Sequence, residues 1–399
     1  LLLSFVMLLT MLPVTVSAEG AEEAAGGAVT GHVLDISYGD ITITNNGFTY
    51  YVADDADATQ VQEKTYNWVG GEARKVTITG TSVGDADSKT LAHFVTIEGG
   101  DPEITLDNVT IEHPKDAIIN FAPGIVLMAG KATLALKGNN AITGSNQSPA
   151  VQINKDAVLT IKDSGDGDGV LAAESRNHTA AIGAPRYNSF ALNTKGGKDN
   201  AYRNGGKLIV ESGVIEAKTT VAGQAGAIGA SNGTYFGDIT IKGGTVRVQT
   251  DAAYGIATYT NCLETNKSLR VDEMGSLAIE GGKVSVITKN QDLAKGKVAI
   301  MANAFTMSAG TLAEMTAKLT HFNVQSATIT GGNTNDYYDG AAEVSGTKVK
   351  LYFFDTESKP LANADVTVDS WTAMTDGDGT ITTYLPAGTT SVTYNGKSY

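Results

Sequence analysis

Residues 207–217 read KLIVESGVIEA, residues 238–250 read DITIKGGTVRVQT, and residues 276–288 read SLAIEGGKVSVIT. In each stretch apolar and polar residues alternate with a period of two, the alternation breaks at glycine, and it then resumes. This pattern predicts two short β-strands in each stretch. A glycine corner joins the two strands, because glycine readily adopts the left-handed backbone that such a corner requires.

The same unit recurs along the chain from residue 76 to residue 332. Periods of about 20–50 residues are typical of repeat architectures. The first strands align on two sets of aliphatic or aromatic residues: Ile104, Leu134 and Leu159, which are 30 and 25 residues apart, and Leu208, Ile239, Leu277 and Phe305, which are 31, 38 and 28 residues apart.

A third short apolar motif follows each pair of strands. It reads Ala-Ile-Gly at 181–183 and 227–229, Gly-Ile-Ala at 255–257 and Ala-Ile-Met at 299–301. Three short strands per repeat, with small residues at the corners and no helical period, predict a parallel β-helix whose stacked turns bury ladders of aliphatic side chains. The uneven length of the three-strand turns favours a right hand. The alternative is an array of β-sandwiches, which needs a hairpin signal at every strand junction, and such signals are few.

The chain divides into five segments. Residues 1–18 (LLLSFVMLLTMLPVTVSA) are typical of a secretory signal peptide, and residues 19–28 are a polar, flexible leader. Residues 29–75, with an Asn-Asn-Gly turn at 45–47, are expected to form an N-terminal β cap. The parallel β-helix occupies 76–342, and a small β-sandwich, expected to be truncated, occupies 343–399. We therefore expect a secreted or cell-surface protein.

Composition excludes several functional classes. The formal net charge of −14 argues against a nucleic-acid partner, because such binders need a basic surface. The single cysteine, Cys262, permits neither a disulfide within the chain nor a cysteine-based zinc site. No stretch after the signal peptide is apolar enough to cross a membrane. The five dispersed histidines form no metal-binding motif, and each is expected to be structural or on the surface.

The segments ITLDNVTI, LALKGNNAITG, GDGDGVLAAES and DITIKGGTVRV together resemble a known group of proteins. They are similar to the carbohydrate-binding parallel β-helix proteins of Firmicutes, including calcium-dependent binders of polygalacturonate on clostridial cell surfaces. The resemblance spans about 76 to 332 and implies a β-helix fold and a polysaccharide or cell-wall glycan as partner. Residues 343–399 resemble the prealbumin-like or CNA-B-like modules of bacterial surface proteins.

An acidic loop, Asp163-Ser-Gly-Asp166-Gly-Asp168-Gly, is the candidate metal site. Carboxylates on a flexible, glycine-rich loop suit Ca²⁺, which takes six to eight oxygen ligands. The competing interpretation is a solvated turn between two strands. The similar run at 376–379 (DGDG) is interpreted as a turn of the C-terminal module.

The loops that follow the Ala-Ile-Gly strands are the candidate carbohydrate site. If the turns stack, these loops lie along one edge, where aromatic faces suit sugar rings and arginine suits uronate carboxylates. The alternative is that the aromatic side chains pack the loops onto the body of the protein. The candidate residues are Arg186, Tyr187, Tyr202, Arg203, Tyr235, Phe236 and Tyr259.

The sequence favours a binding or adhesion protein over an enzyme, and it offers no catalytic residue. Related folds also carry polysaccharide lyases, which need Ca²⁺ ligands beside a basic residue, and glycoside hydrolases, which need paired carboxylates. The strands carry few acidic residues at repeated positions. A lyase or hydrolase and a purely structural stalk stay as alternatives.

Overall fold

The structure is a computed structural model that describes residues 31–54, 57, 60–88, 90–114, 122–167, 169–186, 204–220, 224–251, 254–260, 274–288, 298–313, 322–334 and 344–399. The predicted signal peptide and leader, and Cys262, lie outside these residues. The described part of the chain is all-β, with long parallel sheets and without helices. It accordingly has no helix that meets the length and hydrophobicity needed to cross a membrane. The prediction of an all-β protein is confirmed.

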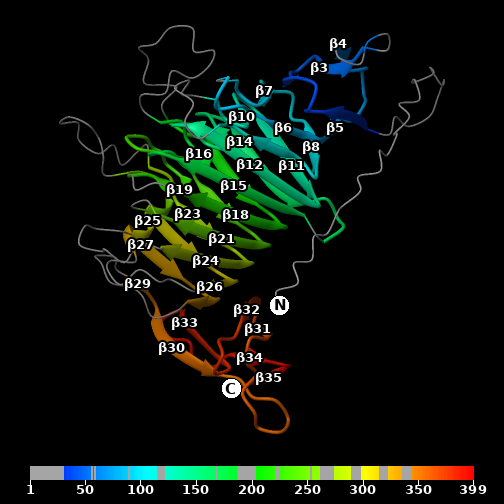
Figure 1. The fold of residues 1–399 in the computed structure, drawn as a ribbon. Helices are drawn as coiled ribbons and strands as arrows, with labels where there is room; N and C mark the ends of the chain where they lie inside the picture. The colour runs from blue at the N-terminus through cyan, green and yellow to red at the C-terminus, as the bar shows by residue number, and fades with distance from the viewer. Residues whose placement is uncertain are drawn as a thin grey trace, which may run out of the picture. The chain divides into compact units, whose positions relative to one another are not determined.

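Three long series of parallel strand pairs, here called ladders 1, 2 and 3, make up most of the protein (Figure 1). Ladder 1 contains β1 (His32–Asp35), β5 (Lys75–Thr79), β8 (Glu103–Asp107), β11 (Lys131–Lys137), β14 (Val158–Asp163), β17 (Lys207–Val210), β20 (Ile239–Ile241), β23 (Leu277–Ile279), β25 (Val298–Met307), β27 (Phe322–Ile329) and β29 (Val344–Ser345). Ladder 2 contains β2 (Ile41–Ile43), β7 (Val95–Ile97), β10 (Ile125–Leu127), β13 (Val151–Ile153), β16 (Ile182–Gly183), β19 (Gly226–Gly229), β22 (Tyr254–Ala257) and the first halves of β25 and β27. Ladder 3 contains β6 (Thr81–Val83), β9 (Thr110–Glu112), β12 (Asn139–Asn146), β15 (Val170–Arg176), β18 (Val214–Thr219), β21 (Thr245–Thr250), β24 (Lys283–Thr288), β26 (Thr311–Ala313) and β28 (Asn333–Thr334).

From β7 onward the chain visits ladders 2, 1 and 3 in constant rotation. The register follows the sequence repeats. In ladder 1, Leu208 pairs with Ile239, Ile239 with Leu277, and Leu277 with Phe305, as predicted. The third motif aligns equally well, since its isoleucines pair in ladder 2: Ile182, Ile228, Ile256 and Ile300.

One part of the predicted register is wrong. Leu134 pairs with Ile104 as expected, but its other partner is Ile161, and Leu159 pairs with Ala132. The error is a shift of two residues. Such a shift leaves the same side chains on the same face of the strand, so alternation alone does not reveal it.

The inward side chains of all three ladders form one hydrophobic core. Ile161, Val210 and Ile241 in ladder 1, and Ile215 and Val246 in ladder 3, are at most 1% exposed. The outward side chains between them are partly or fully exposed, which is the alternation seen in the sequence.

Glycine corners connect ladder 1 to ladder 3, as predicted. Gly244 has a φ of 75°, and a Cβ at this position would lie 2.4 Å from the carbonyl oxygen of Gly213 on the preceding corner. Gly282 repeats the arrangement one strand further on, with a φ of 74°. Stacked backbones this close leave no room for a side chain, so the corners present bare peptide groups.

An antiparallel hairpin lies at the N-terminal end, where a cap was expected. β2 and β3 (Gly47–Ala53) pair across the predicted turn at 45–47, and β3 pairs with β4 (Val61–Asn67). Phe48 and Tyr66 face each other in this hairpin, with ring centroids 5.1 Å apart, and Trp68 packs against the Phe48 ring at 5.2 Å. The range 29–75 also contains β1 and β2, the first strands of ladders 1 and 2.

Residues 347–399 form two small antiparallel sheets around a separate hydrophobic core. One sheet consists of β30 (Thr347–Tyr352) and β33 (Thr380–Leu385). The other consists of β32 (Trp371–Met374), β31 (Asp365–Val368), β34 (Thr393–Tyr394) and β35 (Lys397–Ser398). Asn333, on the last strand of ladder 3, joins this C-terminal module through its amide: Nδ2 donates to the Met374 carbonyl at 2.7 Å, and Oδ1 accepts from the Thr382 N–H at 3.0 Å.

Candidate functional site

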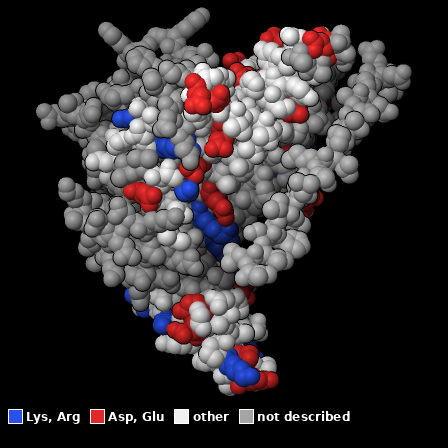
Figure 2. All heavy atoms as spheres, viewed as in Figure 1, with Lys and Arg blue, Asp and Glu red and all other residues white. Residues whose placement is uncertain are grey.

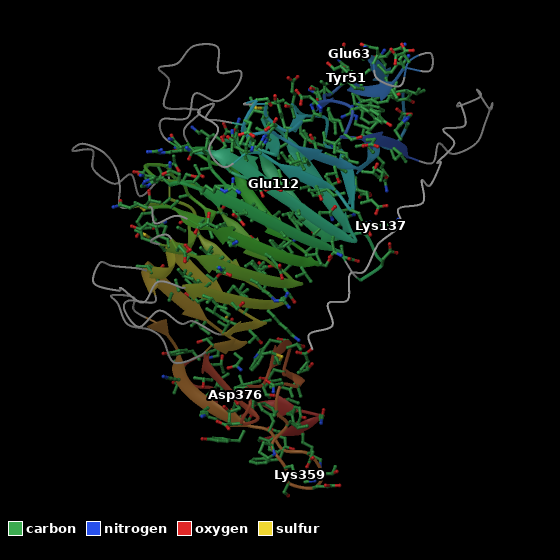
Figure 3. All side chains as sticks on the ribbon, viewed as in Figure 1. Tyr51, Glu63, Glu112, Lys137, Lys359 and Asp376 are labelled. Atoms are coloured by element: carbon green, nitrogen blue, oxygen red, sulfur yellow. The ribbon has the colours of Figure 1, made fainter. Side chains whose placement is uncertain are left out.

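Charged side chains gather on the outward face of ladder 3, where Figure 2 shows blue and red atoms in one band. The strand register places Glu112, Thr143, Glu174, Lys218 and Gln249 in one outward column, with neighbours on adjacent strands. Glu112 is labelled on this face in Figure 3. The column therefore presents polar groups at intervals of about 4.8 Å, the spacing between paired strands.

The column is most basic at the corner between β15 and β16. Glu174 accepts from Lys218 Nζ at 2.8 Å through Oε2, and its Oε1 lies 3.8 Å from Arg176 Nε. Arg176 is 8% exposed, whereas the Lys218 side chain is 41% exposed. Two cations thus share one carboxylate, which leaves this corner with an excess of positive charge.

The corner itself adopts an unusual backbone. Asn177 and His178 follow β15 and have φ values of 55° and 71°. Two consecutive residues in the left-handed region are strained unless their surroundings hold them. Here Asn177 Nδ2 donates to Asn146 Oδ1 at 2.9 Å, and the Asn232 N–H donates to the His178 carbonyl at 3.0 Å. These two hydrogen bonds hold the backbone of the corner, from which the His178 side chain projects.

His178 links this corner to the predicted carbohydrate site. Burial and the positive charge of Arg186, which follows β16, both lower the pKa of the His178 imidazole. Its Nδ1 lies 3.3 Å from Asn232 Nδ2, which identifies Nδ1 as an acceptor from the amide. We call Arg176, His178, Arg186 and Lys218, together with Glu174, the corner patch.

Of the predicted carbohydrate-binding residues, Arg186 is half-buried and belongs to the corner patch. Tyr187, Tyr202 and Arg203 lie outside the described residues. They remain predictions about the loop that follows Arg186.

The other three candidates are close together but buried. Tyr235 forms an isolated antiparallel bridge with Tyr259, so the structure brings these two loops side by side. Their exposed fractions are 7% and 2%, and that of Phe236 is 0%. Tyr235 and Tyr259 belong to a small apolar cluster with Ala257 and Met301, which lies outside the main core, and Phe236 belongs to the main core. Side chains buried to this extent present no stacking face, so their burial supports the packing interpretation.

The backbone of the acidic loop donates hydrogen bonds to the first carboxylate of the loop, that of Asp163. Asp163 accepts hydrogen bonds from the N–H groups of Gly165, Gly167 and Gly169 at 2.8, 2.9 and 3.0 Å. These donors lower the pKa of Asp163, with that of Gly167 contributing most. A carboxylate has about four lone-pair positions, so Asp163 retains about one for a metal ion. Asp166 lies on the same loop, and Asp168 lies outside the described residues.

The acidic loop and the corner patch lie at opposite ends of β15. Asp163 precedes the strand and Arg176 ends it, and six residue steps along a strand span about 20 Å. A single ion on the loop therefore cannot bridge a ligand at the corner patch.

Asp376, in the C-terminal module (Figure 3), occupies a turn, in line with the interpretation of the sequence. Its Oδ1 accepts from the N–H groups of Asp378 at 3.0 Å and Thr380 at 2.7 Å, and its Oδ2 accepts from the Thr380 hydroxyl at 2.6 Å. Among the residues that the structure describes, no group of three or more His, Cys, Asp or Glu side chains is arranged to hold a metal ion.

Sequence reasoning did not single out Arg176, His178 or Lys218. The run Glu-Ser-Arg-Asn-His at 174–178 contains a signal, because Asn and His tolerate the left-handed backbone better than most residues. Lys218, however, lies 44 positions after Glu174, and only the strand register brings the two together.

Comparison of the chain with protein-family models, with curated proteins and with solved structures found no match.

Proposed function

We propose that the chain winds as a right-handed parallel β-helix and that it is a secreted or cell-surface protein that binds an acidic polysaccharide without cleaving it. The constant rotation of the chain through ladders 2, 1 and 3 supports the β-helix, because each rotation adds one strand to every ladder. The resemblance of residues 76–332 to polygalacturonate-binding β-helix proteins supports the ligand class.

The corner patch is the observation that carries the proposal. A protein of net charge −14 repels a polyanion as a whole, so binding requires a local excess of positive charge. Arg186 and Lys218 bring two partly exposed cations to this corner. Arg176, beside Glu174, adds a third positive charge but is only 8% exposed. Arginine also offers paired N–H donors that match the geometry of a uronate carboxylate.

The outward column of ladder 3 extends the surface beyond the corner patch. Neighbouring strands are about 4.8 Å apart, which is close to the length of one sugar residue in an extended chain. Thr143 and Gln249 offer hydroxyl and amide groups on either side of the charged positions. Several successive strands can therefore contact one polysaccharide chain.

Binding is favoured over cleavage because two acidic groups of this face are paired with cations. Glu216 accepts from Arg247 at 2.8 Å, and Glu174 is held between two cations. A general acid or base must contact the substrate to exchange a proton with it, whereas these two carboxylates contact cations of the protein.

Calcium assistance through Asp163, Asp166 and Asp168 is a separate part of the proposal. A metal on this loop would act about 20 Å from the corner patch, at the other end of β15. Binding that depends on calcium should be lost when EDTA removes the metal, whereas binding that depends on the corner patch should persist.

The test is calorimetric titration of the full chain with polygalacturonate, with and without EDTA. We expect binding that weakens as salt is added, and that Arg186→Gln weakens about tenfold through the loss of a charged hydrogen bond. Lys359→Gln is the matched control, because it removes the same charge from a side chain that is 72% exposed on the C-terminal module. It should leave the affinity unchanged.

Four outcomes contradict parts of the proposal. Equal affinities for the two variants would remove the corner patch as the binding site. Complete loss of binding in EDTA would assign the main role to calcium. Unsaturated or newly reducing sugar ends would identify a lyase or a hydrolase, and the absence of binding to any acidic polysaccharide would leave a structural stalk.

A further inference from the structure

A groove of about 450 Å³ lies between ladder 3 and the C-terminal module. Its volume is within the range of about 300–1,000 Å³ that is typical of small-ligand sites. One wall consists of glycine corners and residues at the start of β24 and β26, and the other consists of residues of β31 and β32. It is distinct from the corner patch, because it lies at the glycine-corner end of the ladder 3 strands.

Glycine corners form the floor of the groove. Gly244, Gly281, Gly282 and Gly310 contribute bare backbone to its floor. At Gly244, Gly281 and Gly310 a Cβ would lie within 2.6 Å of atoms of the preceding corner. The floor of the groove therefore consists of closely stacked backbone without side chains.

Direct hydrogen bonds hold the two walls together. The Gly310 N–H donates to the Thr372 carbonyl at 2.7 Å, and the Met374 N–H donates to Thr311 Oγ1 at 2.8 Å. Trp371, which lines the groove, is only 6% exposed and belongs to the core of the C-terminal module. The groove is therefore fixed on both sides before any ligand arrives, which reduces the entropic cost of binding.

The charges of the groove select the class of ligand. Glu280 and Asp365 provide two carboxylates, and Lys283 provides one ammonium group, which lies 3.6 Å from Asp365 Oδ1. The excess of negative charge disfavours a uronate. The carboxylates accept hydrogen bonds from hydroxyl groups, and Lys283 and the hydroxyl of Ser370 donate to sugar oxygens.

From this geometry we infer that the groove is a binding site for a neutral oligosaccharide. The Lys283–Asp365 pair is exposed, with side chains 45% and 60% accessible, so it contributes little to stability and its groups are available to a ligand. The site is independent of the acidic-polysaccharide surface, and the protein would carry two sugar-binding sites of different charge preference.

The experiment is titration of the full chain with cellotriose, maltotriose and xylotriose, with trigalacturonate as the acidic counterpart. We expect at least one neutral trisaccharide to bind with a Kd of about 0.1–1 mM. Asp365→Asn should weaken that binding at least about tenfold, because an amide replaces one acceptor oxygen with a donor. Hydrogen exchange should become slower at residues 281–283 and 371–374 when the sugar is bound.

The matched control is Glu357→Gln, which removes a carboxylate that is 71% exposed elsewhere on the same module. It should bind the trisaccharide as the unchanged protein does, and all variants should keep the same melting temperature. Failure of every neutral trisaccharide to bind at about 10 mM, or equal effects of Asp365→Asn and Glu357→Gln, would overturn the inference. Arg186→Gln tests the acidic-polysaccharide surface alone, so either site can fail without the other.

Discussion

His113 offers a sharp test of the electrostatics of the ladder 3 edge. It follows β9, is 0% exposed, and its Nε2 lies 3.3 Å from the Pro123 carbonyl oxygen. With Nε2 as the donor to that oxygen, Nδ1 is a buried acceptor that has no partner among the described residues. Burial lowers the pKa of His113 from 6.5 to about 4. The folded protein thus holds this imidazole neutral.

The free energy of unfolding should therefore decrease as the pH falls. Because the folded pKa of His113 is below the unfolded one, its stabilising effect is complete above pH 6.5 and is lost between pH 6.5 and about 4. The full loss is about 3 kcal/mol, at about 1.4 kcal/mol per pKa unit. Between pH 7 and pH 5 we expect a loss of about 2 kcal/mol.

The assay is urea denaturation at several pH values for the unchanged protein, His113→Leu and Ile215→Ala. Other groups titrate in the same range, so the relevant quantity is the difference in pH dependence between variants. His113→Leu should lose about 2 kcal/mol less than the unchanged protein between pH 7 and pH 5. Ile215→Ala is the control, because it lowers stability without removing a titratable group, and the pH dependence of its stability should match that of the unchanged protein. Parallel curves for all three proteins would refute the reasoning.

Three further predictions concern the fold and the acidic loop. Gly244→Ala should destabilise the protein by about 1–3 kcal/mol through backbone strain and contact with the preceding corner, whereas Gly377→Ala, with no atom within 4 Å of the new Cβ, should have little effect on the melting temperature. Ile215→Ala should cost about 2–5 kcal/mol in urea denaturation, because it opens a cavity at a position that is 0% exposed. Asp163→Asn should lower the melting temperature at neutral pH, because the low pKa of this carboxylate means that its ionised form stabilises the folded protein. The unchanged protein loses this stabilisation when acid protonates Asp163, so the two melting temperatures should differ less at acidic pH than at neutral pH. If Ca²⁺ raises the melting temperature of the unchanged protein but not of Asp163→Asn, the loop is a metal site.

Local pattern was sufficient to predict the strands and their glycine corners. Alternation identifies which residues face the core, and the left-handed glycines at 244 and 282 follow from the corner geometry. Pairing is a non-local property, and it was predicted correctly only where consecutive repeats share the same motif. Between Leu134 and Ile161 the loop length changes, and alternation cannot distinguish registers that differ by two residues.

The candidate site was predictable only in part, for related reasons. Arg186 stands next to the Ala-Ile-Gly motif and was identified by its position. Lys218 and Arg176 become neighbours of one carboxylate only after the strands pair.

Tyr235 and Tyr259 show a second limit of prediction from the sequence. An aromatic residue in a loop has the same sequence signature whether its ring is exposed to a ligand or, as here, packed in an apolar cluster.

Asn333 covers the edge of β28, the last strand of ladder 3, which has no further strand to pair with among the residues that the structure describes. A terminal β-strand exposes unpaired peptide groups, which can recruit a strand from another molecule and start fibre growth. The Asn333 side chain donates to the carbonyls of Met374 and Thr380 and accepts from the Thr382 N–H, so its donor and acceptor groups both bind the backbone of the C-terminal module. The module thereby blocks this growing end, and a chain shortened before residue 347 would be expected to assemble end to end, with light scattering as the simplest readout.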